Sequence, residues 1–145
     1  MSLLDKRPKA VTRLGTFVLI LTSWHVYKLV VIAQNWELLE QFGFRLSPIY
    51  LAAEALVWTL TGSFLTWNLL ARSKHYPKRL KLAVVLYVIA RISKEGFLIN
   101  LGISSANFKF EIALIIIIAF LVLWSANRRG TLLYFGELNE RQQKD

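Results

Sequence analysis

The sequence predicts an all-α, polytopic membrane protein, a four-transmembrane-helix bundle with both termini cytoplasmic. Two observations predict this fold class. Hydrophobic residues make up 55% of the 145 residues and charged residues only 19%, whereas a typical soluble domain is about 45–50% apolar and about 25% charged. The basic residues also gather in short segments beside long apolar runs, which is a signal of membrane topology. The length fits a single domain over residues 1–145.

The first transmembrane helix is expected over about residues 14–33. It follows a basic start that contains Lys6, Arg7, Lys9 and Arg13. A secretory signal also begins this way, but here no small-x-small cleavage site follows and the apolar run is longer than a signal core. At about 1.5 Å per residue the run is about 30 Å long, the thickness of the hydrocarbon layer. We therefore expect a retained helix.

The second transmembrane helix is expected over about residues 47–70. The connection before it, over residues 34–46, is rich in aromatic residues, and we expect it to lie at the membrane surface. Proline is tolerated in the first turn of a helix, which is where Pro48 falls. A row of small residues four apart lets a neighbouring helix approach closely, and the second helix carries such a row at Ala55, Thr59 and Ser63.

The third and fourth transmembrane helices are expected over about residues 82–100 and 110–126. The segment before the third helix contains five Lys and Arg residues and no acid. The fourth helix includes four consecutive isoleucines, Ile115 to Ile118, and is the most hydrophobic of the four. It is therefore expected to contact lipid over much of its girth and to add no ionisable residue to the polar layer described below.

The distribution of basic residues predicts the orientation. Lys and Arg number four before the first helix, one in the first loop, five in the second, at most one in the third and two directly after the fourth. Cytoplasmic segments carry the excess of Lys and Arg, so both termini and the middle loop are expected in the cytoplasm, and the inner membrane of a prokaryote is the expected location. No nucleic-acid recognition element accompanies the net charge of +9, so no nucleic-acid partner is expected.

Polar residues within the predicted helices form one layer. The third helix carries four of them on one face, at spacings of four, seven and eight: Tyr87, Arg91, Lys94 and Glu95. The first and second helices carry the others: His25, Lys28 and Glu54. With the orientation above, the ionisable residues of this layer lie about 7–13 Å below the outer surface. Each buried charge costs about 2.5–3.5 kcal/mol on insertion scales, so these residues are expected to face protein and to have partners.

The layer has two interpretations. In the first it is structural: Glu54 pairs with Arg91 across two helices, Tyr87 or His25 completes the hydrogen bonds, and the lysines extend toward the headgroups. In the second it is a binding site. Three cations against two carboxylates leave one positive charge, which would attract an anionic headgroup, a quinone oxygen or a partner's carboxylate.

The surroundings of Glu54 suggest a transporter. Tyr50, Glu54 and Trp58 follow one another at four-residue spacing, so the carboxylate lies between two aromatic rings that favour a lipophilic cation. This pattern resembles the buried glutamate with aromatic neighbours of small multidrug transporters, which also have four helices. Their glutamate lies in the first helix, and here three cations share the layer. The resemblance is one of size and chemistry and assigns no family.

His25 is the only histidine in a predicted span. A lone imidazole there can ligate haem or a chlorophyll magnesium, with Trp24 and Tyr27 lining the pocket, or it can be a hydrogen-bonded packing residue. A bis-histidine haem would need a second chain, because His75 falls in the opposite loop. We predict no cofactor and no metal.

The sequence favours a non-catalytic role. It has no cysteine, no Ser/His/Asp set, no metal-ligand spacing and no phosphate-binding loop. The sequence therefore shows no recognisable set of residues for nucleophilic, metal-assisted or acid–base catalysis. We expect an accessory or assembly subunit of a larger integral-membrane complex. Its expected partners are membrane lipids and other membrane subunits, or copies of itself. The alternatives are a small homo-oligomeric transporter that uses Glu54 and a haem- or pigment-carrying subunit that uses His25.

Overall fold

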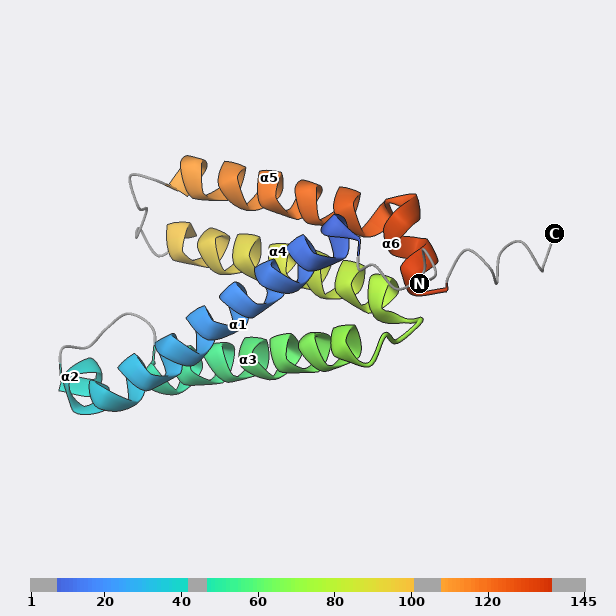
Figure 1. Cartoon of the computed structure of the whole chain (residues 1–145). Coiled ribbons are helices and arrows are strands. Elements are labelled where there is room, and N and C mark those ends of the chain that lie inside the picture. Colours follow the sequence, from blue (N-terminus) through green and yellow to red (C-terminus); the bar gives the residue numbers. More distant parts are fainter. Residues whose placement is uncertain (1–7, 42–46, 101–107, 137–145) are drawn as a thin grey trace. The chain divides into compact units, whose positions relative to one another are not determined.

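A computed structural model describes residues 8–41, 47–100 and 108–136 of the chain, and these residues form six helices without a strand. In chain order the helices are α1 (Lys9–Gln34), α2 (Trp36–Gln41), α3 (Pro48–Leu70), α4 (Tyr76–Asn100), α5 (Phe108–Asn127) and α6 (Arg129–Tyr134) (Figure 1). The predicted all-α class is thus confirmed for the described residues.

Three helical segments are long and apolar enough to cross a membrane. They are Lys9–Gln34, Pro48–Leu70 and Lys109–Asn127, and they match the first, second and fourth predicted spans. Helix α4 is equally long, but Arg91, Lys94 and Glu95 lie close together in its second half. Together with Lys78, Arg79 and Lys81 in its first half, these charges make α4 the least apolar of the four long helices.

The helices extend beyond the apolar runs that predicted them. Helix α1 begins at Lys9 rather than near residue 14, and α4 begins at Tyr76 rather than near residue 82. Hydropathy marks only the part of a helix that lies in hydrocarbon, whereas backbone hydrogen bonding continues into the headgroup region. Pro77 lies in the first turn of α4, where its missing N–H has no helical partner to lose.

Two short helices follow long ones. In α2, Trp36 Nε1 donates a hydrogen bond of 2.9 Å to Glu40 Oε1, so the aromatic residue and the acid are held on one face of the predicted surface connection. Helix α6 was not predicted. It forms because Arg128 adopts an extended backbone (φ −61°, ψ 136°) that ends α5, after which the chain turns into a new helix.

The chain divides into two compact units. The α3 unit comprises residues 15–71 and the α5 unit comprises residues 1–14 and 72–145. The expectation of a single domain over residues 1–145 stays a prediction.

In the α3 unit, α1 and α3 approach closely at two glycines. A Cβ atom added at Gly62 would overlap the Thr22 side chain, and one added at Gly15 would lie 2.7 Å from Leu69 Cδ2. Residue numbers rise along α1 as they fall along α3, so the two helices are antiparallel.

The close approach does not follow the predicted row of small residues. Ala55 is buried, but Ser63 is exposed and Gly62 makes the tight contact instead. Ala55, Gly62 and Leu69 are all buried and lie seven residues apart. A seven-residue repeat keeps one seam of a helix against its neighbour, as in coiled-coil packing, whereas a strict four-residue row drifts off that seam.

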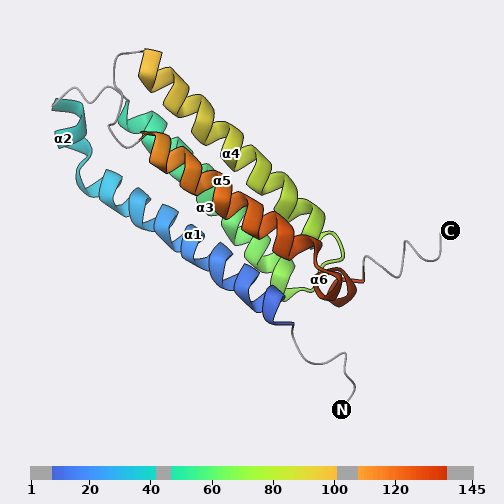
Figure 2. The ribbon, with the colours of Figure 1, turned by 90° about the horizontal axis from the view of Figure 1, so that it is seen from above.

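In the α5 unit, α4 and α5 lie alongside each other (Figures 1 and 2). Several of the buried side chains lie where α4 begins and α6 follows α5. They are Tyr76, Pro77, Leu80, Ala126, Thr131 and Phe135. The rings of Tyr76 and Phe135 have centroids 4.8 Å apart, and Thr131 Oγ1 donates a hydrogen bond of 2.9 Å to the Ser125 carbonyl, which ties α6 to the last turns of α5.

Candidate functional site

The structure distributes the predicted polar layer over both units. Tyr87, Arg91, Lys94 and Glu95 belong to the α5 unit; the α3 unit holds His25, Lys28 and Glu54 together with the aromatic neighbours Tyr50 and Trp58. The predicted pair of Glu54 and Arg91 would join the two units, and it stays a prediction.

In the α5 unit, Arg91 lies between two carboxylates. Its Nη2 atom is 3.7 Å from Glu95 Oε1 and 3.8 Å from Glu111 Oε2. Both distances are those of ion pairs and exceed the usual length of a hydrogen bond. The side chains are 23% exposed at Arg91, 12% at Glu95 and 43% at Glu111. We call these three residues the charged trio.

Local structure explains how the charged trio forms. Arg91 and Glu95 are four residues apart in α4, so one side chain lies a helical turn above the other. Glu111 lies in the first turn of α5, where the positive end of the helix dipole favours a carboxylate. Packing of α4 alongside α5 then brings the second carboxylate to Arg91.

Glu111 corrects the expectation that the fourth helix adds no ionisable residue. It was missed because it stands at the edge of a strongly apolar run. The available signal was its position, since acidic residues are enriched in the first turn of helices. That turn comes soon after the end of α4, so Glu111 is near the end of the hairpin at which Glu95 also lies.

The guanidinium of Arg91 lies nearer to the end of α4 and the start of α5 than the Arg91 backbone does. Arg91 stands nine residues before the end of α4 at Asn100, about 13 Å along the axis, and Glu95 stands five residues before it, about 7.5 Å. Glu111 is three residues inside α5, about 4.5 Å. Because both carboxylates are nearer the ends, the long Arg91 side chain carries its charge toward them, as snorkelling side chains do.

Tyr87 and Lys94 complete the polar face of α4, and both are half-buried. The face of α4 that carries charge is therefore covered by the chain only in part. Such a face can pair with opposite charges or exchange hydrogen bonds with groups outside the chain.

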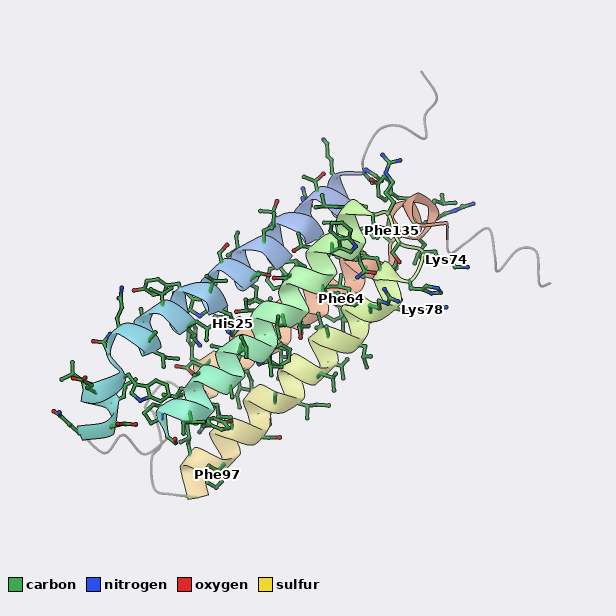
Figure 3. All side chains as sticks on the ribbon, turned by 90° about the horizontal axis from the view of Figure 1, so that it is seen from below. His25, Phe64, Lys74, Lys78, Phe97 and Phe135 are labelled. Carbon is green, nitrogen blue, oxygen red and sulfur yellow. The ribbon has the colours of Figure 1, made fainter. Side chains whose placement is uncertain are left out.

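In the α3 unit, His25 is a packed residue. Its side chain is 2% exposed, and its ring centroid lies 6.5 Å from that of Trp58 at an angle of 36°. Figure 3 shows His25 midway along α1. Trp24 and Tyr27, which were expected to line a pocket around it, are 53% and 59% exposed. Neighbouring positions on a helix point in different directions, so these two rings flank an exposed surface and not the buried imidazole.

Lys28 and Glu54 lie at the same height in the α3 unit. The contacts of Gly15 with Leu69 and of Thr22 with Gly62 define how α1 and α3 are aligned. For each residue forward along α1, the residue opposite it in α3 is one position earlier in the chain. Lys28 is then level with residue 56, two residues from Glu54, or about 3 Å along the axis. Both are half-buried. Lys28 Nζ also lies 5.8 Å from the centroid of the Trp24 ring, within the range of a cation–π contact.

Glu54 keeps the aromatic surroundings that suggested a transporter. It is half-buried, with Tyr50 46% exposed on one side and Trp58 half-buried on the other. Among the described residues, no group of three or more His, Cys, Asp and Glu side chains is placed to hold a metal ion. The cofactor expectations for His25 stay predictions.

Comparison with known proteins gave no match: no family model, no curated protein and no solved structure matches the chain. What the protein does must therefore be inferred from its own residues and their geometry.

Proposed function

We propose that the protein is a non-catalytic accessory or assembly subunit of a larger integral-membrane complex. It crosses the inner membrane of a prokaryote four times and keeps both termini in the cytoplasm. The observation that carries the proposal is the partial exposure of the polar face of α4 and of the acid that α5 places against it: the side chain of Arg91 is 23% exposed and that of Glu111 is 43% exposed.

The proposal first needs α4 to be the fourth span. Three observations support it. Helix α4 has 25 residues, or about 37 Å, which exceeds the hydrocarbon thickness of about 30 Å. It packs alongside α5, a candidate span. The alternation of basic and basic-poor segments also favours four crossings.

A spanning α4 needs neighbours of its own. Charged side chains in a bilayer almost always face protein or a water-filled cavity, and they pair with other groups. The charged trio supplies partners within the chain, but its exposed part remains to be covered. A second protein that places polar groups against Arg91 and Glu111 would lower the cost of keeping α4 in the membrane. Accessory subunits of membrane complexes gain stability from such contacts.

Copurification tests the proposal. The tagged full-length protein, extracted from its native membrane in mild detergent, should retain larger membrane proteins in fixed stoichiometry. Glu111→Gln, which weakens the charged trio, should reduce that ratio, whereas Glu37→Gln removes an exposed carboxylate from α2 and should not. Circular dichroism and gel filtration of the variants confirm that they fold. If the protein purifies alone, or only with copies of itself, the accessory role is wrong.

One observation favours the transporter as a second candidate. Glu54 is half-buried between rings one turn before and one turn after it, an arrangement that can hold a lipophilic cation. A purified homo-oligomer that moves a fluorescent lipophilic cation into liposomes, and loses this activity in Glu54→Gln, would establish that role. An absorbance spectrum of the same sample tests the haem or pigment role of His25.

A further inference from the structure

One end of the α5 unit is strongly basic. Six exposed Lys and Arg residues gather where α4 begins and α5 passes into α6: Arg72, Lys74, Lys78, Arg79, Arg128 and Arg129. We call this set the basic end. Figure 3 shows Lys74 and Lys78 at this end, near Phe135. The segments 72–81 and 125–136, which contribute these residues, include no Asp or Glu.

The basic end lies at the boundaries of two candidate spans. The apolar segment of α5 ends at Asn127, directly before Arg128, and α3 ends at Leu70, two residues before Arg72. Residues at these positions reach the headgroup region when the adjoining helices cross the membrane. This placement holds whichever side of the membrane the basic end faces.

Two guanidinium groups of the basic end are held by aromatic rings. Arg128 Cζ lies 4.0 Å from the centroid of the Trp124 ring, and Arg72 Cζ lies 5.0 Å from that of Tyr134. A guanidinium that stacks on a ring uses its flat face and keeps its N–H groups at the edge, where they can donate in pairs to a phosphate.

Helix α6 provides a fixed base for this surface. Thr131, Leu132 and Phe135 are buried against the unit, while Arg129 and Leu133 are exposed. These buried contacts fix α6 on the unit, so that Arg129 and Leu133 stay at its surface.

We propose that the basic end binds the headgroups of anionic phospholipids. The argument is charge complementarity at the right depth: six cations, no acid in the segments that carry them, and two pre-positioned guanidiniums at the ends of apolar helices. Clusters of four to eight Lys and Arg beside a transmembrane helix recognise anionic lipid in this way. The inference is independent of the proposed accessory role, because it concerns the opposite end of α5 from the charged trio.

Thermal unfolding in non-ionic detergent tests the proposal. The full-length protein is heated with added phosphatidylglycerol or with phosphatidylcholine of the same acyl chains. Phosphatidylglycerol should raise Tm by several degrees more than phosphatidylcholine does, and the difference should shrink in about 1 M salt, where the Debye length is about 3 Å. Equal shifts with the two lipids would overturn the proposal.

Two variants and a matched control locate the effect. The triple variant Arg72→Gln, Arg128→Gln, Arg129→Gln should lose the preference for phosphatidylglycerol. If it does not fold, Arg129→Gln alone, at an exposed position, should still weaken the preference. Lys109→Gln removes one exposed cation from the other end of α5 and should leave the preference unchanged. A preference that is unchanged in the triple variant, or unchanged in Arg129→Gln where the triple variant does not fold, would contradict binding of lipid headgroups. An equal shift with inorganic phosphate or a short DNA duplex would contradict it as well.

Discussion

The two units hold their helices together by opposite means. In the α3 unit, α1 and α3 meet where a side chain is missing, since Gly62 receives Thr22 and Gly15 receives Leu69. In the α5 unit, the buried rings of Tyr76 and Phe135 pack together where α4 begins and α6 follows α5, and the charged trio links α4 to α5 near the other end. The contact between α1 and α3 depends on the absence of a side chain at the two glycines, whereas the core of the α5 unit depends on large side chains. A larger residue at either glycine should therefore destabilise the α3 unit, and a smaller residue in place of a buried ring should destabilise the α5 unit.

The largest expected effect concerns whether α4 crosses the membrane at all. The chain has no cysteine, so single cysteines can be introduced at Lys78 and Lys109, exposed positions near the two ends of the α4–α5 hairpin. With a membrane-impermeant maleimide on intact cells, Lys109→Cys should be labelled and Lys78→Cys should react only after permeabilisation. Equal labelling of both would remove the fourth span.

Loss of a ring from the α5 unit should be the next largest effect. Phe135 is 3% exposed and stacks against Tyr76. Phe-to-Ala changes in soluble cores cost about 3–5 kcal/mol, so Phe135→Ala should lower the thermal stability strongly. Phe97, 56% exposed on α4, is the matched control. If Phe97→Ala lowers Tm as much as Phe135→Ala, the contact between Tyr76 and Phe135 is not part of the unit's core.

Added volume should damage the α3 unit. In Gly62→Ala the new methyl group overlaps Thr22, and overpacking typically costs about 1–3 kcal/mol. Gly96→Ala in α4 meets nothing within 4 Å and gains helix propensity of about 1 kcal/mol, so it should be neutral or stabilising. Thermal unfolding of both variants measures the contrast. A destabilisation of the same size at both glycines would refute the close approach.

The smallest effect is expected from the charged trio. A double-mutant cycle with Arg91→Gln and Glu111→Gln should give a favourable coupling of about 0.6 kcal/mol, the average for polar contacts within membranes, and at most about 1.7 kcal/mol. Each side chain of this pair is partly exposed, which keeps the coupling small. Purely additive losses would mean that the 3.8 Å contact does not stabilise the hairpin.

Much of the fold follows from the sequence, because hydropathy marks the apolar middle of each long helix. The positions of the helix ends do not follow from hydropathy, because α1 begins at Lys9 and α4 begins at Tyr76, both outside the apolar runs. The seam of α3 was misplaced by one residue: Ser63 fits a four-residue row, but a seven-residue repeat selects Gly62. Spacing could also show that Arg91 shares a face with Glu95. It could not show that α5 brings Glu111 to the same guanidinium, because that contact depends on how two helices pack.

Photo-crosslinking beside the charged trio tests the proposed function most directly. Leu114 is 45% exposed and lies about one turn from Glu111 on α5, so p-benzoylphenylalanine in its place would sample whatever covers that surface in native membranes. The accessory role predicts a discrete adduct with another, larger membrane protein, which weakens when Glu111→Gln is added. Adducts with lipid alone, or with a second copy of this chain alone, would contradict it.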